Sequence, residues 1–206
     1  MTEVNEATPR VSRGQFIRNA AKGSVMLVGA GGVLATMDGV AFAKTTKSDI
    51  TVLQTGYIAE TLAVTIYGAI LKTYYRKFKL SNRDYFVAAY KDEVAHRDAW
   101  KKMLGSHVPH GFKLTVPGKY VASKKALVDT GVALEEAFVA TYMGAVKEFS
   151  SPDLRVAAAG VAANEATHYS FLDAAAGGHA VLPAFGPKAI TASTAAKTLT
   201  KLGFLS

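Results

Sequence analysis

Apolar residues recur three and four positions apart along four long stretches of the chain, which is the spacing of one face of an α-helix. The pattern predicts helices over about residues 49–78, 81–104, 123–149 and 151–176. The first two are separated by only a short connection, so we expect them to form an antiparallel hairpin. Residues 106–122 contain two prolines and two glycines and have no helical period, which predicts a crossover. The chain is therefore predicted to be all-α, a four-helix bundle of two antiparallel hairpins joined by a long crossover.

Residues that start and stop helices agree with these limits. Ser81 is the expected N-cap of the second helix, with Asp84 in its first turn, and Gly105 ends that helix. Ser151 is the expected N-cap of the fourth helix, and Pro152 takes its first position. These signals are independent of the apolar pattern and place the helix ends at the same points.

The chain of 206 residues, half of them apolar, is long enough for one domain with a sizeable core. We assign the bundle to residues 44–178. Residues 179–206 form a tail with Pro183 and Pro187 and a short helix near 192–202. This tail is expected to pack on the outside of the bundle.

Charged residues interrupt all four apolar stripes near their middles, where a core is expected. The first and third stripes each carry one glutamate, and the second and fourth each carry a Glu-x-x-His motif. Residues three apart lie on one face of a helix, so each motif aims a carboxylate and an imidazole at the same point. The six residues are Glu60, Glu93, His96, Glu135, Glu165 and His168.

Helical phase separates the adjacent glutamates of the third helix. Glu135 lies on the apolar stripe, whereas the register through Glu136 collects Asp129 and Lys147. We therefore expect Glu135 to point inward and Glu136 to face water.

The two halves of the bundle repeat one another weakly. Tyr67 follows Glu60 by seven residues, and Tyr142 follows Glu135 by the same interval. Each half thus supplies one glutamate and then one Glu-x-x-His motif. Two halves related by a pseudo-twofold axis would bring all six side chains to one midpoint.

A buried, unpaired carboxylate costs several kcal/mol, so a compensating group is required, and a metal would supply it. Four carboxylates and two imidazoles form a hard oxygen and nitrogen site, which suits iron or manganese better than copper. Four ionised glutamates carry a charge of −4, which two divalent cations would cancel. The chain has no cysteine, which removes disulfides, thiolate metal sites and cysteine nucleophiles.

This pattern resembles the ferritin-like superfamily of carboxylate-bridged dimetal proteins. The narrower resemblance is to exported bacterial ferritin-like domain proteins related to plant desiccation-related proteins, and it covers roughly residues 49–177. It is carried by the segments Ala133-Leu134-Glu135-Glu136 and Tyr142-Met143-Gly144-Ala145. The resemblance implies that the six residues bind two metal ions, iron or manganese, with open positions for dioxygen or peroxide.

The resemblance also implies a role for the residue before each motif glutamate. By this analogy Asp92 would orient His168 from the opposite helix, and Asn164 would orient His96. The alternative for both residues is a solvated helix face.

Three tyrosines lie on the stripes that carry the six residues. Tyr57, Tyr67 and Tyr142 are candidates for redox activity, and the alternative is aromatic filling of the core. We expect Tyr67 and Tyr142 to lie next to the metal ligands.

The first 43 residues have the features of an export signal. Basic residues precede the apolar run at 25–37, and Ala41-Phe42-Ala43 offers a small-x-small cleavage site. The surroundings of Arg13 resemble a twin-arginine motif, with Gly14 where the second arginine belongs. We expect a cleaved leader at residues 1–43 and a periplasmic or extracellular bacterial protein; the alternative is an uncleaved amphipathic anchor.

The net charge of +8 comes from lysines scattered through helices and loops, not from a basic stripe with interleaved aromatic residues. Nucleic acid is therefore not an expected partner. We expect metal ions and small oxidants as partners, no stable membrane span after cleavage, and leave a homodimer open.

Three functions are compatible with the sequence. The first is a dimetal protein that handles Fe(II), dioxygen or peroxide in oxidative or desiccation stress, with ferroxidase-like or peroxide-consuming activity. The second is a structural, stress-protective bundle whose metal site is not catalytic. The third, a ferritin storage cage, fits less well because export is unusual there and the tail is not a clean fifth bundle helix.

Overall fold

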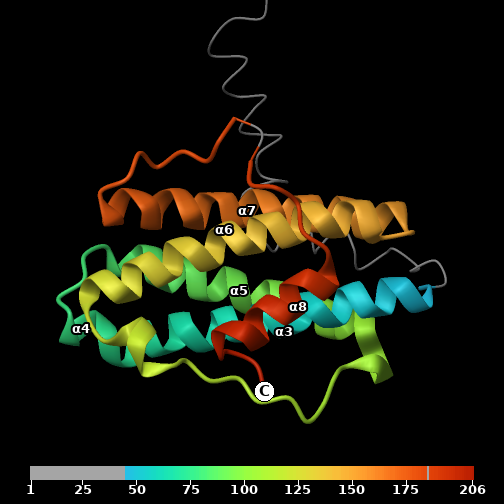
Figure 1. The fold of residues 1–206 in the computed structure, drawn as a ribbon, viewed down its shortest axis with the longest axis horizontal. Coiled ribbons are helices and arrows are strands. Elements are labelled where there is room, and N and C mark those ends of the chain that lie inside the picture. The colour runs from blue at the N-terminus through green and yellow to red at the C-terminus, as the bar shows by residue number, and fades with distance from the viewer. Residues whose placement is uncertain (1–44, 185) are drawn as a thin grey trace, which may run out of the picture.

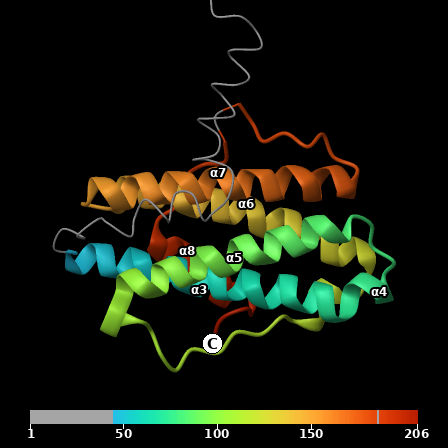
Figure 2. The same ribbon diagram turned by 180° about the vertical axis from the view of Figure 1, so that it is seen from behind.

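The computed structural model describes residues 45–184 and 186–206, and nearly all of their regular structure is helical (Figure 1). Figures 1 and 2 show two pairs of long helices lying side by side, with a shorter helix packed across them. The long helices are α3 (Lys47–Ala69), α5 (Arg83–Leu104), α6 (Lys124–Glu148) and α7 (Pro152–Ala176). The predicted all-α bundle with a short C-terminal helix is confirmed.

The first predicted helix has the expected extent but contains a change of pitch. After α3 the chain passes through one turn of π-helix, η2 (Ile70–Tyr74), and ends in α4 (Tyr75–Lys77). The predicted inner stripe is also shifted, because Tyr57 is half-buried and stacks edge-on against Phe112 of the crossover. Small residues such as Gly56 lie on the buried face instead, and they let neighbouring aromatic rings approach the helix closely.

The second helix begins later than predicted, so the assignment of Ser81 as its N-cap was wrong. The residue before α5 is Asn82, which has a φ of 59° and forms no side-chain cap. Lys79, three residues earlier, is also left-handed, with a φ of 50°. Two left-handed residues in one short turn reverse the chain before a helix can start, and asparagine tolerates that conformation better than most residues. Asp84 does lie in the first turn, as predicted.

The crossover contains two short 3₁₀ turns, η3 (Gly105–His107) and η4 (Gly118–Val121), and is otherwise extended. Its middle pairs with the end of the chain, since the Lys113 N–H donates to the Ser206 carbonyl at 2.8 Å and the Lys113 carbonyl accepts from the Ser206 N–H at 3.1 Å. An isolated bridge joins Leu114 to Leu205. The crossover and the tail therefore hold each other against the bundle.

The C-terminal helix α8 (Ala192–Leu202) buries Leu199 and two alanines against the bundle. Just before it, the tail crosses α6 at very short range, because the Ile190 N–H donates to the Ala140 carbonyl at 3.0 Å. A Cβ atom on Gly144 would lie 1.8 Å from the Ile190 carbonyl oxygen, so only glycine fits beneath the tail at this point.

Asp49 ties the start of α3 to the turn between α6 and α7. Its carboxylate accepts hydrogen bonds from the main-chain N–H of Ser150 at 2.7 Å and from that of Thr46 at 3.1 Å, as well as from both hydroxyls. Burial raises the pKa of Asp49, but the hydrogen bonds from Ser150 and Thr46 outweigh it and leave the pKa below its ordinary value. The two hairpins are thus joined at one end by an ionised, fully hydrogen-bonded carboxylate.

Within residues 45–184 and 186–206, no helix combines the length and apolar character needed to cross a membrane. The predicted export signal at residues 1–43 lies outside the described residues, as does its cleavage site.

Candidate metal centre

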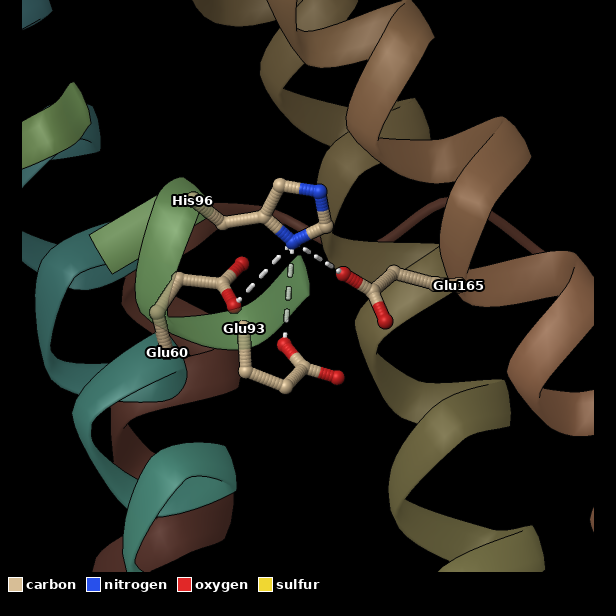
Figure 3. Close-up of side chains that lie close together, drawn as sticks. All are labelled: Glu60, Glu93, His96 and Glu165. Atoms are coloured by element: carbon tan, nitrogen blue, oxygen red, sulfur yellow. Dashed lines mark ion pairs between the residues drawn. The ribbon is translucent and has the colours of Figure 1, made fainter. Parts of the chain in front are cut away.

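The structure brings all six predicted residues together at the middle of the bundle. Every long helix contributes, and each of the six side chains is between 0 and 3 % exposed. Figure 3 shows Glu60, Glu93, His96 and Glu165 pointing toward one another. The contributors are Glu60 from α3, Glu93 and His96 from α5, Glu135 from α6, and Glu165 and His168 from α7. Glu136 is exposed, as its helical phase predicts.

The six residues form two overlapping groups, each able to surround one ion. The ligand atoms of Glu60, Glu93, His96 and Glu165 all lie within 4.8 Å of one another. So do those of Glu93, Glu135, Glu165 and His168. Glu93 and Glu165 belong to both groups, so the two positions share two carboxylates and each has one histidine and one glutamate of its own.

Both imidazoles turn the same ring nitrogen toward the shared carboxylates. The Nδ1 atom of His96 lies 3.1 Å from Glu165 Oε1 and 3.6 Å from Glu93 Oε2. The Nδ1 atom of His168 lies 3.0 Å from Glu93 Oε1 and 3.2 Å from Glu165 Oε2. The mirrored arrangement follows from the repeated Glu-x-x-His spacing on two facing helices, and it offers one imidazole nitrogen to each position.

Many polar atoms of the cluster have no hydrogen-bond partner among the described residues. They include both carboxylate oxygens of Glu93, one oxygen each of Glu60, Glu135 and Glu165, and Nδ1 of His96. Nδ1 of His96 lies 3.1 to 3.6 Å from oxygens of three carboxylates but makes no hydrogen bond with any of them. An unsatisfied buried polar atom costs about 1–3 kcal/mol. Inward-facing acceptors of this kind, with a summed charge of −4 when ionised, fit two divalent cations.

Without a cation the cluster must hold protons. Burial, and next the charge of Glu93, raise the pKa of Glu60 to about 7. Burial together with the charges of Glu165 and Glu93 raises the pKa of Glu135 well above its ordinary value. Burial would lower the pKa of His96, but the facing carboxylates, Glu60 foremost, raise it. In the metal-free site the side chains therefore share protons, and cations must displace these protons when they bind.

Two tyrosines donate hydrogen bonds to the unshared glutamates, and each crosses to the other half of the bundle. The Tyr67 hydroxyl donates to Glu135 Oε1 at 2.6 Å, and the Tyr142 hydroxyl donates to Glu60 Oε1. Burial is the main cause that raises the pKa of both hydroxyls well above the ordinary value, so both remain donors. The tyrosine that follows the glutamate by seven residues in each half therefore bonds the corresponding glutamate of the other half.

Aromatic residues extend both of these contacts away from the cluster. Trp100 Nε1 donates to the Tyr142 hydroxyl at 2.9 Å, and the Tyr85 and Tyr67 hydroxyls lie 3.3 Å apart. Trp100 is itself buried in the core. Tyr85 was not predicted at all, because it reaches the site from the first turn of α5, eight residues before Glu93.

The two residues that precede the motif glutamates behave differently. Asp92 Oδ2 lies 3.6 Å from Nε2 of His168, on the side of the ring opposite the cluster. The predicted contact of Asn164 with His96 is not formed, and Asn164 Oδ1 is buried without a hydrogen-bond partner in the described part of the chain.

Comparison with known families agrees with this geometry. Residues 48–178, more than half of the chain, match the family model described as a ferritin-like domain. The chain therefore belongs to the ferritin-like domain family. No curated protein matches the chain.

We expect Glu60→Gln to stabilise the metal-free protein at high pH. The pKa of Glu60 is about 7 in the folded protein and 4.5 in the unfolded chain. The free energy of unfolding therefore falls as the pH rises between those two values, because the unfolded chain ionises this carboxyl first. The cost reaches about 3 kcal/mol at most and is complete above pH 7. Glutamine cannot ionise, so the variant should gain stability over the wild type at pH 8 and lose that gain near pH 4.

Urea unfolding in the presence of a chelator measures this difference at both pH values. Glu136→Gln is the matched control, because Glu136 is exposed and should change neither curve. A metal-free Glu60→Gln variant that is less stable than the wild type at pH 8 would show that repulsion in the cluster is not a significant cost.

Proposed function

We propose that the protein binds two divalent metal ions, iron or manganese, at the two overlapping groups. Glu93 and Glu165 are shared between the ions, and each position is completed by one histidine and one further glutamate. The observation that carries this proposal is the set of buried carboxylate oxygens that face one another without donors. Hard oxygen and nitrogen ligands favour iron and manganese over softer metals.

We further propose that the protein handles Fe(II), dioxygen or peroxide. A bound pair of redox-active ions would supply the electron transfer that such chemistry needs. The residues around the site support this assignment: Tyr67 and Tyr142 hold the unshared glutamates in place, and Asp92 faces the outer nitrogen of His168. The surrounding apolar core keeps bulk water away from the carboxylates.

The size of the space beside the cluster favours small reactants. An apolar cavity of about 20 Å³ touches Glu135 and Tyr67 and is bounded by Gly131 and Leu172. Its volume is on the order of one water molecule. Dioxygen, peroxide and single metal ions match this scale, whereas an organic substrate does not.

The same burial favours one alternative function, in which the metal pair only holds the bundle together. All six residues are at most 3 % exposed. A closed centre of this kind ties four helices to one point whether or not it turns over a substrate.

The cellular setting that we propose is export, with the mature chain in the periplasm or outside the cell and a role in oxidative or desiccation stress. Support comes from the basic and apolar leader at residues 1–43 with its Ala41-Phe42-Ala43 end. Mass spectrometry of protein secreted by a bacterial host should find a mature N-terminus near Lys44. An intact leader on the exported protein would favour the anchored form instead.

Glu135→Ala should lower the metal content, because Glu135 is the unshared carboxylate of one position. We expect two ions per chain in the wild type and at most one in the variant, measured by elemental analysis after loading with Fe(II) or Mn(II). Glu136→Ala is the matched control, since it removes the neighbouring exposed glutamate and should leave the content at two. Equal losses in both variants would point to misfolding, and no loss in either would contradict the dimetal assignment.

Oxygen uptake after addition of Fe(II) separates the two functions. Rapid consumption in the wild type that falls in Glu135→Ala supports the redox role. Two tightly bound ions with no consumption support the structural role.

A further inference from the structure

A hollow lies away from the metal centre, between α6 and α8. It has a volume of about 390 Å³, which is within the range of small-molecule sites in proteins. Figure 1 shows α8 crossing in front of α3 and below α6, with the C-terminus beside the crossover. The floor of the hollow is formed by Ala59, Leu134 and Phe138, and its outer wall by Leu199 and Leu202 of α8. We call this hollow the α6–α8 groove.

Apart from Asp129 at one end, the groove offers an occupant almost nothing but apolar surface. The hydroxyls of Thr130, Thr141 and Thr198 line it, yet each donates its hydrogen to a main-chain carbonyl, at 3.4, 2.7 and 2.9 Å. The Tyr120 hydroxyl likewise donates to the Leu202 carbonyl at 3.2 Å. Ordered water needs two to four polar partners, which this lining does not present.

The groove extends along α6. It follows this helix from Asp129 to Thr141, which corresponds to about 18 Å of helix. Tyr120 lines one end, and its ring stacks on Phe204 with centroids 4.7 Å apart. Ile190 lines the other end, where the tail crosses α6. An extended aliphatic chain matches these dimensions better than a compact ring system does.

Charge differs between the two ends. Beside the aromatic end, Lys119 Nζ lies 4.8 Å from the Tyr120 ring centroid, and Lys125 binds Asp129 at 2.5 Å. Lys201 is exposed and precedes the lining residue Leu202, and the carboxylate of the lining residue Asp129 is paired with Lys125. At the Ile190 end the nearby charge is acidic, because Glu148 accepts the N–H of Ala192 at 2.8 Å. An anionic head group is therefore favoured only at the aromatic end.

We propose that the α6–α8 groove binds the aliphatic chain of a fatty-acid-like carboxylate, with the carboxylate at Lys119, Lys125 and Lys201 and the chain end near Ile190. The site is separate from the metal centre, since Ala59 and Thr141 line the groove and the adjacent Glu60 and Tyr142 face the other way. The proposal does not rest on the proposed function of the metal pair.

Titration calorimetry with dodecanoate, kept below its micelle concentration, tests the groove on the full mature protein. We expect saturable binding of one molecule per chain. Ala137→Phe fills the groove from α6 and should weaken binding by about tenfold or more, because displacing two buried methylenes costs that much. The control Ala163→Phe places the same ring at an exposed position of α7 and should bind as the wild type does.

The head-group assignment has its own test. The double variant Lys119→Glu, Lys201→Glu should weaken dodecanoate but leave dodecanol unchanged, and Lys101→Glu on α5 is the control. Equal binding of dodecanol and dodecanoate by the wild type would overturn the assignment of the anionic end. The whole proposal is overturned if dodecanoate does not bind, or if Ala137→Phe leaves its binding intact. It is also overturned if light scattering finds a dimer that Ala137→Phe dissociates, because that result assigns the groove to a second copy of the chain.

Discussion

Electrostatic repulsion among four buried glutamates is the constraint on which the rest of this structure depends. Their carboxylates come from four different helices and lie within a few ångströms of one another, in a core where charge is poorly screened. The chain offsets part of this cost internally, because Tyr67 and Tyr142 each donate to one carboxylate and two imidazoles face the remainder. The oxygens that still lack donors account for the rest of the cost. A pair of cations would remove the repulsion and bind all four helices to one centre.

The tyrosine contacts also explain how the two hairpins hold a common geometry. Glu60 and Tyr67 belong to the first hairpin, and Glu135 and Tyr142 belong to the second, so both hydrogen bonds cross between hairpins. The Asp49 contacts join the same hairpins at one end. On the outside, the tail crosses α6 at Gly144 and pairs with the crossover. Contacts inside the bundle, at its end and on its outer surface thus hold the helices that carry the six residues. Such support is needed where side chains must keep a fixed spacing.

Helical phase placed the six residues of the cluster on inward faces, because inward and outward positions differ by one residue. The pair Glu135 and Glu136 shows this directly, with the first buried and the second exposed. Features that depend on contacts between residues far apart in the chain could not be predicted from the apolar pattern. The partners of Tyr67 and Tyr142 lie 68 and 82 residues away, and nothing local specifies them. The buried position of Gly56 and the late start of α5, after Asn82, likewise depend on close packing and on left-handed backbone, which the apolar period does not encode.

The most direct test of the account is a crystal structure of the metal-loaded protein with anomalous data at the iron and manganese edges. The account predicts two peaks about 3.5–4 Å apart, the usual separation in two-metal sites, both in contact with Glu93 and Glu165. One peak should lie at Nδ1 of His96 and the other at Nδ1 of His168. A single peak, peaks outside the six residues, or no peak from protein soaked in excess Fe(II) and Mn(II) would contradict the dimetal centre.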